Sequence, residues 1–277
     1  DDAGLAGSPG KTLGVAMLDY NDDGWPDLYV ANDTHRNLLY ENDGDGTFTE
    51  RGQTAGVAYD ENGSARAGMG VDAAVVDSTG EPTIAVGNFS KEMISVFRHA
   101  GGGLFTNRAA ISGVGRPTLV TLTFGLFFFD ADLDGALDLF AANGHVQPEI
   151  EEATGRIQYE EAPQLFMNDG SGQFTDRAPE LGPPMTDRLV ARGAAYGDYD
   201  RDGDLDILIT ENSGPAHLWR NDLREPETSR PRYLRVHLEG TESNRDGLGA
   251  RVVLSAGGEK KFRTVRTGSS FLAQLEK

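Results

Sequence analysis

The chain has 277 residues, and its 38% apolar content is enough for a substantial core in one large domain or two. Its formal net charge of −19 argues against a nucleic-acid partner, because phosphate contacts require clustered Lys and Arg. Cysteine is absent, which excludes disulfides and thiolate chemistry.

The start of the chain and its apolar runs bear on its compartment. Residues 1–4 show neither the basic start nor the apolar core of a signal peptide, so we expect a mature form or a fragment. The longest apolar run, residues 119–129, is too short to cross a bilayer, and we expect no membrane span.

Three nine-residue stretches place Asp or Asn at alternate positions before a glycine. They begin at Asp19, Asp130 and Asp198, and each leads into a short apolar run of strand length. Alternate carboxylates around a glycine turn can converge on Ca²⁺, which takes about six to eight oxygen ligands. The three stretches lack the glutamate that an EF-hand needs at loop position twelve. They are therefore predicted to be calcium loops between two strands, and the alternative is that they are empty Asp-rich turns.

The glycine that follows each acidic cluster recurs through the chain. Gly24, Gly80, Gly135 and Gly203 are separated by 56, 55 and 68 residues, which indicates a repeat architecture. In the first unit, short strands are expected over 13–18, 28–31, 37–41 and 47–49, so each unit should hold four strands. The units span about 13–57, 68–110, 122–180 and 192–222, within a repeat region of residues 1–222.

The units differ in detail. The second has a degenerate loop, with Thr83 in place of the last aspartate, and we expect this loop to be two residues shorter and to have lost its ion. The third has a Glu-rich insertion between His145 and Pro163, which is predicted to be a solvated surface loop, with partner binding as the alternative. Asp43 and Asp169 lie in Asn-Asp-Gly turns, where turn chemistry is favoured over metal ligation.

A polar, Pro-containing segment over 223–231 is the predicted linker. Residues 232–277 are then expected to form a small β module with a tight hairpin at Gly257 and Gly258. This module is locally basic.

These residues carry a family resemblance. The units resemble the FG-GAP/VCBS repeats of integrin-α-type β-propellers, and residues 244–251 with the Gly-Gly hairpin are similar to the ASPIC/UnbV module. Together they resemble secreted proteins of the cartilage-acidic-protein-like family. The resemblance implies an all-β propeller of four-stranded blades, in which the four visible units are part of a ring of about seven, and a C-terminal module that stops short of its usual end; a closed four-bladed ring is the alternative.

The resemblance also implies a set of metal ligands for about three Ca²⁺ ions. The side-chain ligands would be Asp19, Asn21, Asp23 and Asp27; Asp130, Asp132, Asp134 and Asp138; and Asp198, Asp200, Asp202 and Asp206. The backbone carbonyls of Trp25, Ala136 and Asp204 would complete them.

The predicted function is a non-enzymatic, calcium-binding propeller that mediates protein or carbohydrate interaction outside the cytoplasm, with an accessory subunit of a larger assembly as a variant of this function. Calcium loops of weak to moderate affinity suit an extracellular or periplasmic location, where calcium is about millimolar. One alternative is a lyase or hydrolase acting on polysaccharide, with His35, His145 and His217 as candidate groups, although no nucleophile, base and orienting group can be assembled. A purely structural protein is the other alternative.

Overall fold

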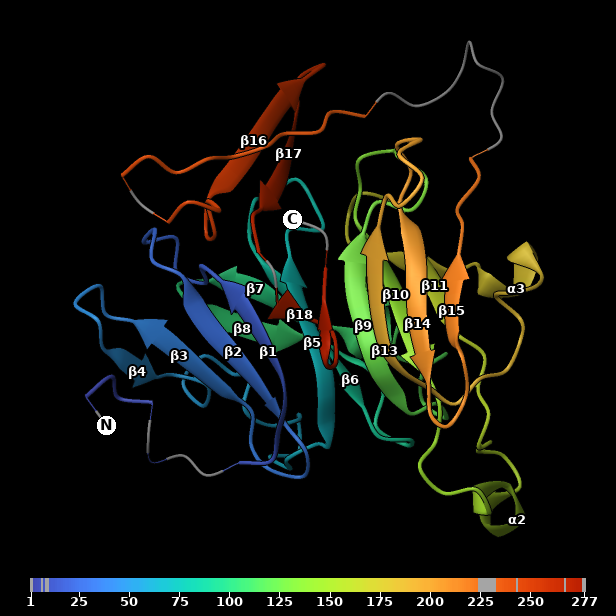
Figure 1. Cartoon of the computed structure of the whole chain (residues 1–277). Helices are drawn as coiled ribbons and strands as arrows, with labels where there is room; N and C mark the ends of the chain where they lie inside the picture. Colours follow the sequence, from blue (N-terminus) through green and yellow to red (C-terminus); the bar gives the residue numbers. More distant parts are fainter. Residues whose placement is uncertain are drawn as a thin grey trace.

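The computed structural model describes residues 2–5, 7, 10–223, 233–242, 244–266 and 268–275. Nearly all of its regular structure is β, and four antiparallel sheets stand side by side as the blades of a propeller (Figure 1). The predicted all-β propeller is therefore confirmed. Among the described residues, no helix is long and apolar enough to cross a membrane.

Each blade is a meander in which strands consecutive in sequence are neighbours in the sheet. Blades one to three have four strands each, and the described part of blade four has three. The first blade contains β1 (Thr12–Leu18), β2 (Asp27–Asn32), β3 (Leu38–Asn42) and β4 (Phe48–Glu50). The second contains β5 (Gly68–Ala74), β6 (Thr83–Asn88), β7 (Ser95–Gly101) and β8 (Leu104–Asn107). The third contains β9 (Thr123–Phe129), β10 (Asp138–Asn143), β11 (Gln164–Asn168) and β12 (Phe174–Asp176). The fourth contains β13 (Ala191–Gly197), β14 (Asp206–Glu211) and β15 (Ala216–Trp219).

The hydrophobic core lies between adjacent blades. The inner strands β1, β5, β9 and β13 are neighbours in that order, and every residue of β5 and β9 is buried. A separate hydrophobic cluster fills each of the three interfaces. Tyr29 and Ile84 lie between blades one and two. Phe128 and Phe166 belong to the cluster between blades two and three, and Phe127 belongs to the cluster between blades three and four. Because the blades pack face to face through these clusters, the loops at the ends of the strands are held in fixed relative positions.

In the part of the chain that the structure describes, three short helices lie outside the sheets: α1 (Ala109–Ser112), α2 (Ile150–Thr154) and α3 (Ala178–Leu181). The Glu-rich insertion contains α2, and none of the residues of this helix is buried. The helical turn of the insertion is thus solvent-facing, whereas Ile157 and Glu161 in the rest of the insertion are buried.

The C-terminal region forms two small sheets. β16 (Arg251–Ala256) and β17 (Glu259–Thr264) pair through the predicted two-residue turn at Gly257 and Gly258. This hairpin lies above the ends of the blades (Figure 1). Of the predicted linker 223–231, all but Leu223 lies outside the described residues.

The last described segment runs back to the inner strands of the propeller. β18 (Gly268–Ser269) lies beside β1 and β5, and β19 (Ala273–Gln274) lies beside β13 (Figure 1). Ser270 exchanges backbone hydrogen bonds with Val71, and the Phe271 ring packs edge-on against Phe124 with 5.0 Å between centroids. The tail therefore contributes to the core near the propeller axis.

Candidate metal centres

The three Asp-rich loops share one backbone conformation. Each loop connects the first strand of a blade to the second, and its fourth residue adopts a positive φ: 59° at Asp22, 60° at Leu133 and 64° at Arg201. The glycine at position six is also in the left-handed region in all three loops. Positive φ is costly for a residue with a Cβ, and it recurs at functional sites where the surroundings fix it. The common strain indicates a common shape.

The last aspartate of each loop joins the loop to the blade. Asp27, Asp138 and Asp206 are almost fully buried, with at most 1% of each residue exposed. In each case one carboxylate oxygen accepts from the N–H of loop residue two at 2.9–3.1 Å. The other oxygen accepts from the N–H of an asparagine at the end of the third strand, or just beyond it, at 2.8–2.9 Å. These aspartates thus close the loop as well as pointing carboxylates toward its centre.

The asparagines at these positions were not among the predicted site residues. The Asn42 amide donates to the Pro26 carbonyl, and the Asn168 amide donates to the Leu137 carbonyl, which tie the third strand to the loop. Asn221 instead donates to the carbonyl of Ala131 in the neighbouring blade. The recurrence of asparagine after the third strand of blades one, three and four is the sequence signal that could have found them.

In the third loop, the structure brings three carboxylates together. Ligand atoms of Asp130, Asp132 and Asp138 all lie within 4.8 Å of one another. Burial raises the pKa of Asp130 to about 6 and that of Asp138 to about 7, with a smaller contribution from the neighbouring carboxylates. Within the described part of the chain, the Oδ1 atom of Asp130 is buried and has no hydrogen-bond partner.

This donor set fits a hard divalent cation. The converging atoms are all carboxylate oxygens, which suit Ca²⁺ or Mg²⁺ rather than a soft metal. A buried carboxylate oxygen without a hydrogen bond is costly unless a cation compensates it. Asp134, a predicted ligand, lies outside the triad and accepts the Ala136 N–H at 2.6 Å.

The fourth loop repeats the arrangement with Asp198, Asp200 and Asp206, whose ligand atoms also lie within 4.8 Å of one another. Asp204 is buried and accepts the N–H of Leu223 at 3.1 Å, and burial raises its pKa to about 6. Asp202 is outside the triad, and its Oδ1 accepts the Asp204 N–H at 3.4 Å.

The first loop has the same backbone shape but a different use of its carboxylates. Asp19 accepts two backbone N–H groups, from Asp23 at 3.2 Å and from Gly24 at 3.0 Å. The Asn21 amide donates to Asp23 at 2.9 Å. No triad of acidic ligand atoms is found in this loop among the described residues, so a third ion stays a prediction.

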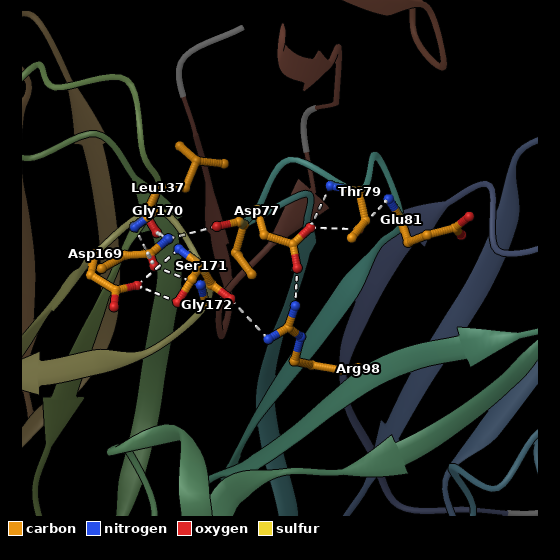
Figure 2. Close-up of polar contacts among 11 residues, drawn as sticks. Asp77, Thr79, Glu81, Arg98, Leu137, Asp169, Gly170, Ser171 and Gly172 are labelled. Atoms are coloured by element: carbon orange, nitrogen blue, oxygen red, sulfur yellow. Dashed lines mark hydrogen bonds and ion pairs between the residues drawn. The ribbon is translucent and has the colours of Figure 1, made fainter. Parts of the chain in front are cut away.

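The second loop has the same length as the others. It spans residues 75–82 between β5 and β6, which matches the eight residues of 19–26 and 130–137, so the predicted shortening was wrong. Its one remaining acidic residue at a ligand position is Asp77, which forms an ion pair with Arg98 of β7 (Figure 2). Arg98 also donates to the Ser171 carbonyl of the third blade at 3.0 Å. The Arg98 guanidinium therefore bridges the Asp77 carboxylate and the third blade.

A cavity of about 350 Å³ lies at the other end of the blades. Most of its lining residues precede β9, β11 and β13 or follow β12, and Gln164 and Asp176 lie at the adjoining ends of β11 and β12, so it opens at the ends of the strands opposite the Asp-rich loops. Arg156 and Arg188 line it, and neither has a hydrogen bond or ion pair with another described residue. Glu161 also lines it, and burial raises the pKa of this carboxyl to about 8.

The candidate histidines have separate local partners. His35 Nδ1 lies 3.2 Å from the Asp33 carbonyl, and His217 Nε2 lies 3.0 Å from Glu211. His145 is fully buried beside Ser90, and burial lowers its pKa. Each arrangement is explained by local packing and hydrogen bonding.

Comparison with known proteins agrees with this architecture. Residues 19–81 and 154–222 match the FG-GAP-like repeat, and residues 240–277 match the ASPIC and UnbV family. The predicted resemblance to both families is confirmed.

A curated relative extends beyond these FG-GAP-like blades. The chain is 24% identical over 256 residues to cartilage acidic protein 1 of Xenopus tropicalis, an alignment that covers 90% of this chain and 36% of that protein. The chain thus spans about a third of the length of this relative.

Two solved structures share similarity at low identity. One is a lectin of Agrocybe aegerita that recognises non-reducing terminal N-acetylglucosamine, with a TM-score of 0.38 and 16% identity over 80% of this chain and 67% of the lectin chain. The other is a candidate exo-β-1,3-galactanase of Bifidobacterium bifidum S17, with a TM-score of 0.40 and 12% identity over 79% of this chain and 73% of that chain.

Proposed function

We propose that this chain is a non-enzymatic, calcium-binding propeller that presents a recognition surface outside the cytoplasm. The observation that carries the proposal is the pair of acidic triads, one in the third loop and one in the fourth. Both triads offer oxygen ligands at the ends of buried strands, and Ca²⁺ binds such sets in flexible geometry. Each ion would hold together carboxylates that otherwise repel one another across the loop.

Calcium is proposed rather than magnesium because of the loop architecture. Mg²⁺ needs near-ideal octahedral geometry and keeps several waters, whereas Ca²⁺ accepts six to eight oxygens from an irregular loop. Affinity should fall in acid, because the ligands must be deprotonated to bind. Calcium loops of weak to moderate affinity suit a compartment in which calcium is about millimolar, such as the extracellular space or periplasm.

The partner-binding surface is proposed to be the side of the propeller that opens away from the Asp-rich loops. The C-terminal hairpin lies over the loop ends (Figure 1), whereas the 350 Å³ cavity opens at the opposite ends of the strands. Arginine and amide side chains in this cavity suit a polar partner, either a protein or a carbohydrate.

The metal part of the proposal is tested by thermal unfolding in Ca²⁺ and in chelator. One ion at a hundred times its dissociation constant stabilises the folded state by about 2.7 kcal/mol, so two ions should give about twice that. The double variant Asp130→Asn/Asp132→Asn should lose about half of this response, and combining it with Asp198→Asn/Asp200→Asn should abolish it.

A charge-matched control is available on α2. Glu151→Gln/Glu152→Gln removes the same charge from two exposed residues and should leave the calcium response unchanged. If wild-type protein unfolds at the same temperature in Ca²⁺ and in chelator, the triads do not bind calcium and the proposal fails.

The partner part is tested on an array of immobilised saccharides and extracellular proteins. Arg156→Ala/Arg188→Ala should weaken any binding that uses the cavity. Arg108→Ala/Arg116→Ala removes two exposed arginines outside the cavity lining and should have no effect. Equal loss in both variants would indicate non-specific charge attraction instead of a site.

A further inference from the structure

Three arginines of the C-terminal module reach the loop ends of the propeller. Arg251 contacts Asp22 of the first loop at 2.9 Å and the carbonyl of Gly80 in the second loop at 2.6 Å. The other two reach the third and fourth loops. They are Arg263, 3.5 Å from Asp130, and Arg235, 2.7 Å from Asp198.

Two of these contacts fall on the candidate metal centres. Asp130 and Asp198 are the first aspartates of the two acidic triads, so each triad shares one carboxylate with an arginine of the module. Asp22, by contrast, belongs to no such triad. The C-terminal module is therefore held to the propeller partly by the same groups that would hold the ions.

We propose that calcium binding and docking of the C-terminal module on the loop face oppose each other, through Arg263 of the hairpin 251–264 and through Arg235 before it, so that the module is a calcium-responsive cover of the loop face. This inference rests on the proposed calcium binding. An ion in either triad and the adjacent guanidinium are like charges that contact one carboxylate. Their repulsion should weaken the arginine contact when the ion binds, and the docked arginine should lower the affinity for the ion. The coupling is reciprocal by thermodynamic necessity.

The tail of the module is attached by contacts that do not involve the triads. Arg266 pairs with the fully buried Asp72 of β5 at 2.7 Å, and it donates to the Ala73 carbonyl. Ser270 and Phe271 then bind β5 and β9 through the backbone pairing and ring contact described above. Calcium should therefore loosen the hairpin while the tail remains in place, which keeps the released hairpin close to the loop face.

Calorimetric titration of the full chain with Ca²⁺ tests the coupling directly. Arg263→Gln and Arg235→Gln should each tighten binding at one of two sites by about tenfold, because each removes a positive charge next to a divalent ion. Arg245→Gln removes the same charge from the same module, where Arg245 is highly exposed and pairs with Glu239, and should leave the affinity unchanged. Arg251→Gln removes a docking contact outside both triads, so any tightening should be smaller than for Arg263→Gln.

Hydrogen exchange supplies a readout independent of affinity. Saturating Ca²⁺ should speed exchange in residues 251–264 of the wild-type chain and leave residues 268–275 unchanged. If Arg263→Gln and Arg235→Gln bind Ca²⁺ with unchanged or weaker affinity, the arginines do not oppose the ions and this inference is wrong, while the calcium proposal stands. If the wild-type chain shows no calcium binding at all, both fail together.

Discussion

The second and third loops are equal in length and begin from equivalent strands, yet they handle their acidic residues differently. In the third loop, Leu133 is held at positive φ and three carboxylates converge. In the second loop, positive φ among the described residues is confined to Gly80, and Asp77 is paired with Arg98 (Figure 2). A strained fourth residue thus occurs in all three Asp-rich loops, including the first, which has no acidic triad among the described residues, and it is absent from the loop whose remaining carboxylate pairs with a guanidinium.

The second blade uses arginine twice. Asp77 pairs with Arg98 of its own blade, and Asp72 pairs with Arg266 of the C-terminal tail. A buried carboxylate must be compensated by a cation, a set of hydrogen bonds or a proton. The difference between the blades shows that an arginine side chain from an adjacent strand or from the C-terminal tail can compensate a carboxylate in this fold, in place of a bound metal ion.

The largest effect should come from removing the arginine of the more deeply buried pair. Asp72 is 0% exposed, and besides Arg266 it accepts only two backbone N–H groups, from Ala73 and Phe128, among the described residues. Arg266→Met leaves this charge uncompensated and should cost about 3–5 kcal/mol of unfolding free energy in urea titrations. The loss should be the same in Ca²⁺ and in chelator, because no triad residue contacts this pair.

A double variant separates pairing from packing. Asp72→Asn/Arg266→Met removes both charges and should recover part of the stability lost in Arg266→Met. If the double variant is as unstable as the single one, the arginine acts by filling space at the axis and not by neutralising Asp72.

A smaller effect is expected in the second loop. Asp77 is largely buried but also accepts hydrogen bonds from the N–H and hydroxyl of Thr79, so it keeps partners when Arg98 is removed. Arg98→Gln should cost about 1–3 kcal/mol, measured by urea unfolding. A midpoint that rises with calcium more in this variant than in wild-type protein would break the comparison, because Asp77 would then recruit an ion.

Much of the fold follows from local sequence signals. The acidic loops, the apolar strands after them and the glycine spacing predict the blades, because turn chemistry and strand alternation act over a few residues. The two acidic triads also involve residues at the predicted loop positions. The sequence did not separate the three clustered carboxylates of a loop from its other aspartates, because Asp134 and Asp202, both at loop position five, continue the same alternate spacing.

Contacts between distant segments were beyond sequence reasoning. Arg266 and Asp72 are 194 positions apart, and they meet only because the tail runs back to β5. The basic composition of the C-terminal module was visible, but the contacts of Arg235 and Arg263 with two different loops depend on how the module docks. The cavity likewise combines residues from several separate loops, so no local motif marks it.

Glu161 is a third case of a buried carboxyl group, because neither an ion-paired arginine nor an ion in an Asp-rich loop compensates it. Its Oε2 accepts the Leu122 N–H at 2.9 Å, while its Oε1 is buried without a hydrogen bond to any described residue. Burial is the main cause that raises its pKa to about 8, whereas Leu122 and the charge of Arg192 act in the opposite direction. Besides an arginine and a metal ion, a bound proton is therefore the third way in which a buried carboxyl group of this molecule is neutralised, here at Glu161.

The last predicted effect is the pH dependence that follows from this proton. Because the folded-state pKa of Glu161 lies above its ordinary value of 4.5, the folded state binds more protons between about pH 4.5 and 8. Wild-type stability should therefore fall as pH rises through this window, by at most about 1.4 kcal/mol per pH unit from this group. Glu161→Gln keeps the shape without the titration, so the difference in unfolding free energy between variant and wild type should grow from pH 6 to pH 8. Parallel curves for the two proteins would mean that Glu161 is already ionised in the folded state, with a cation beside it as at Asp77.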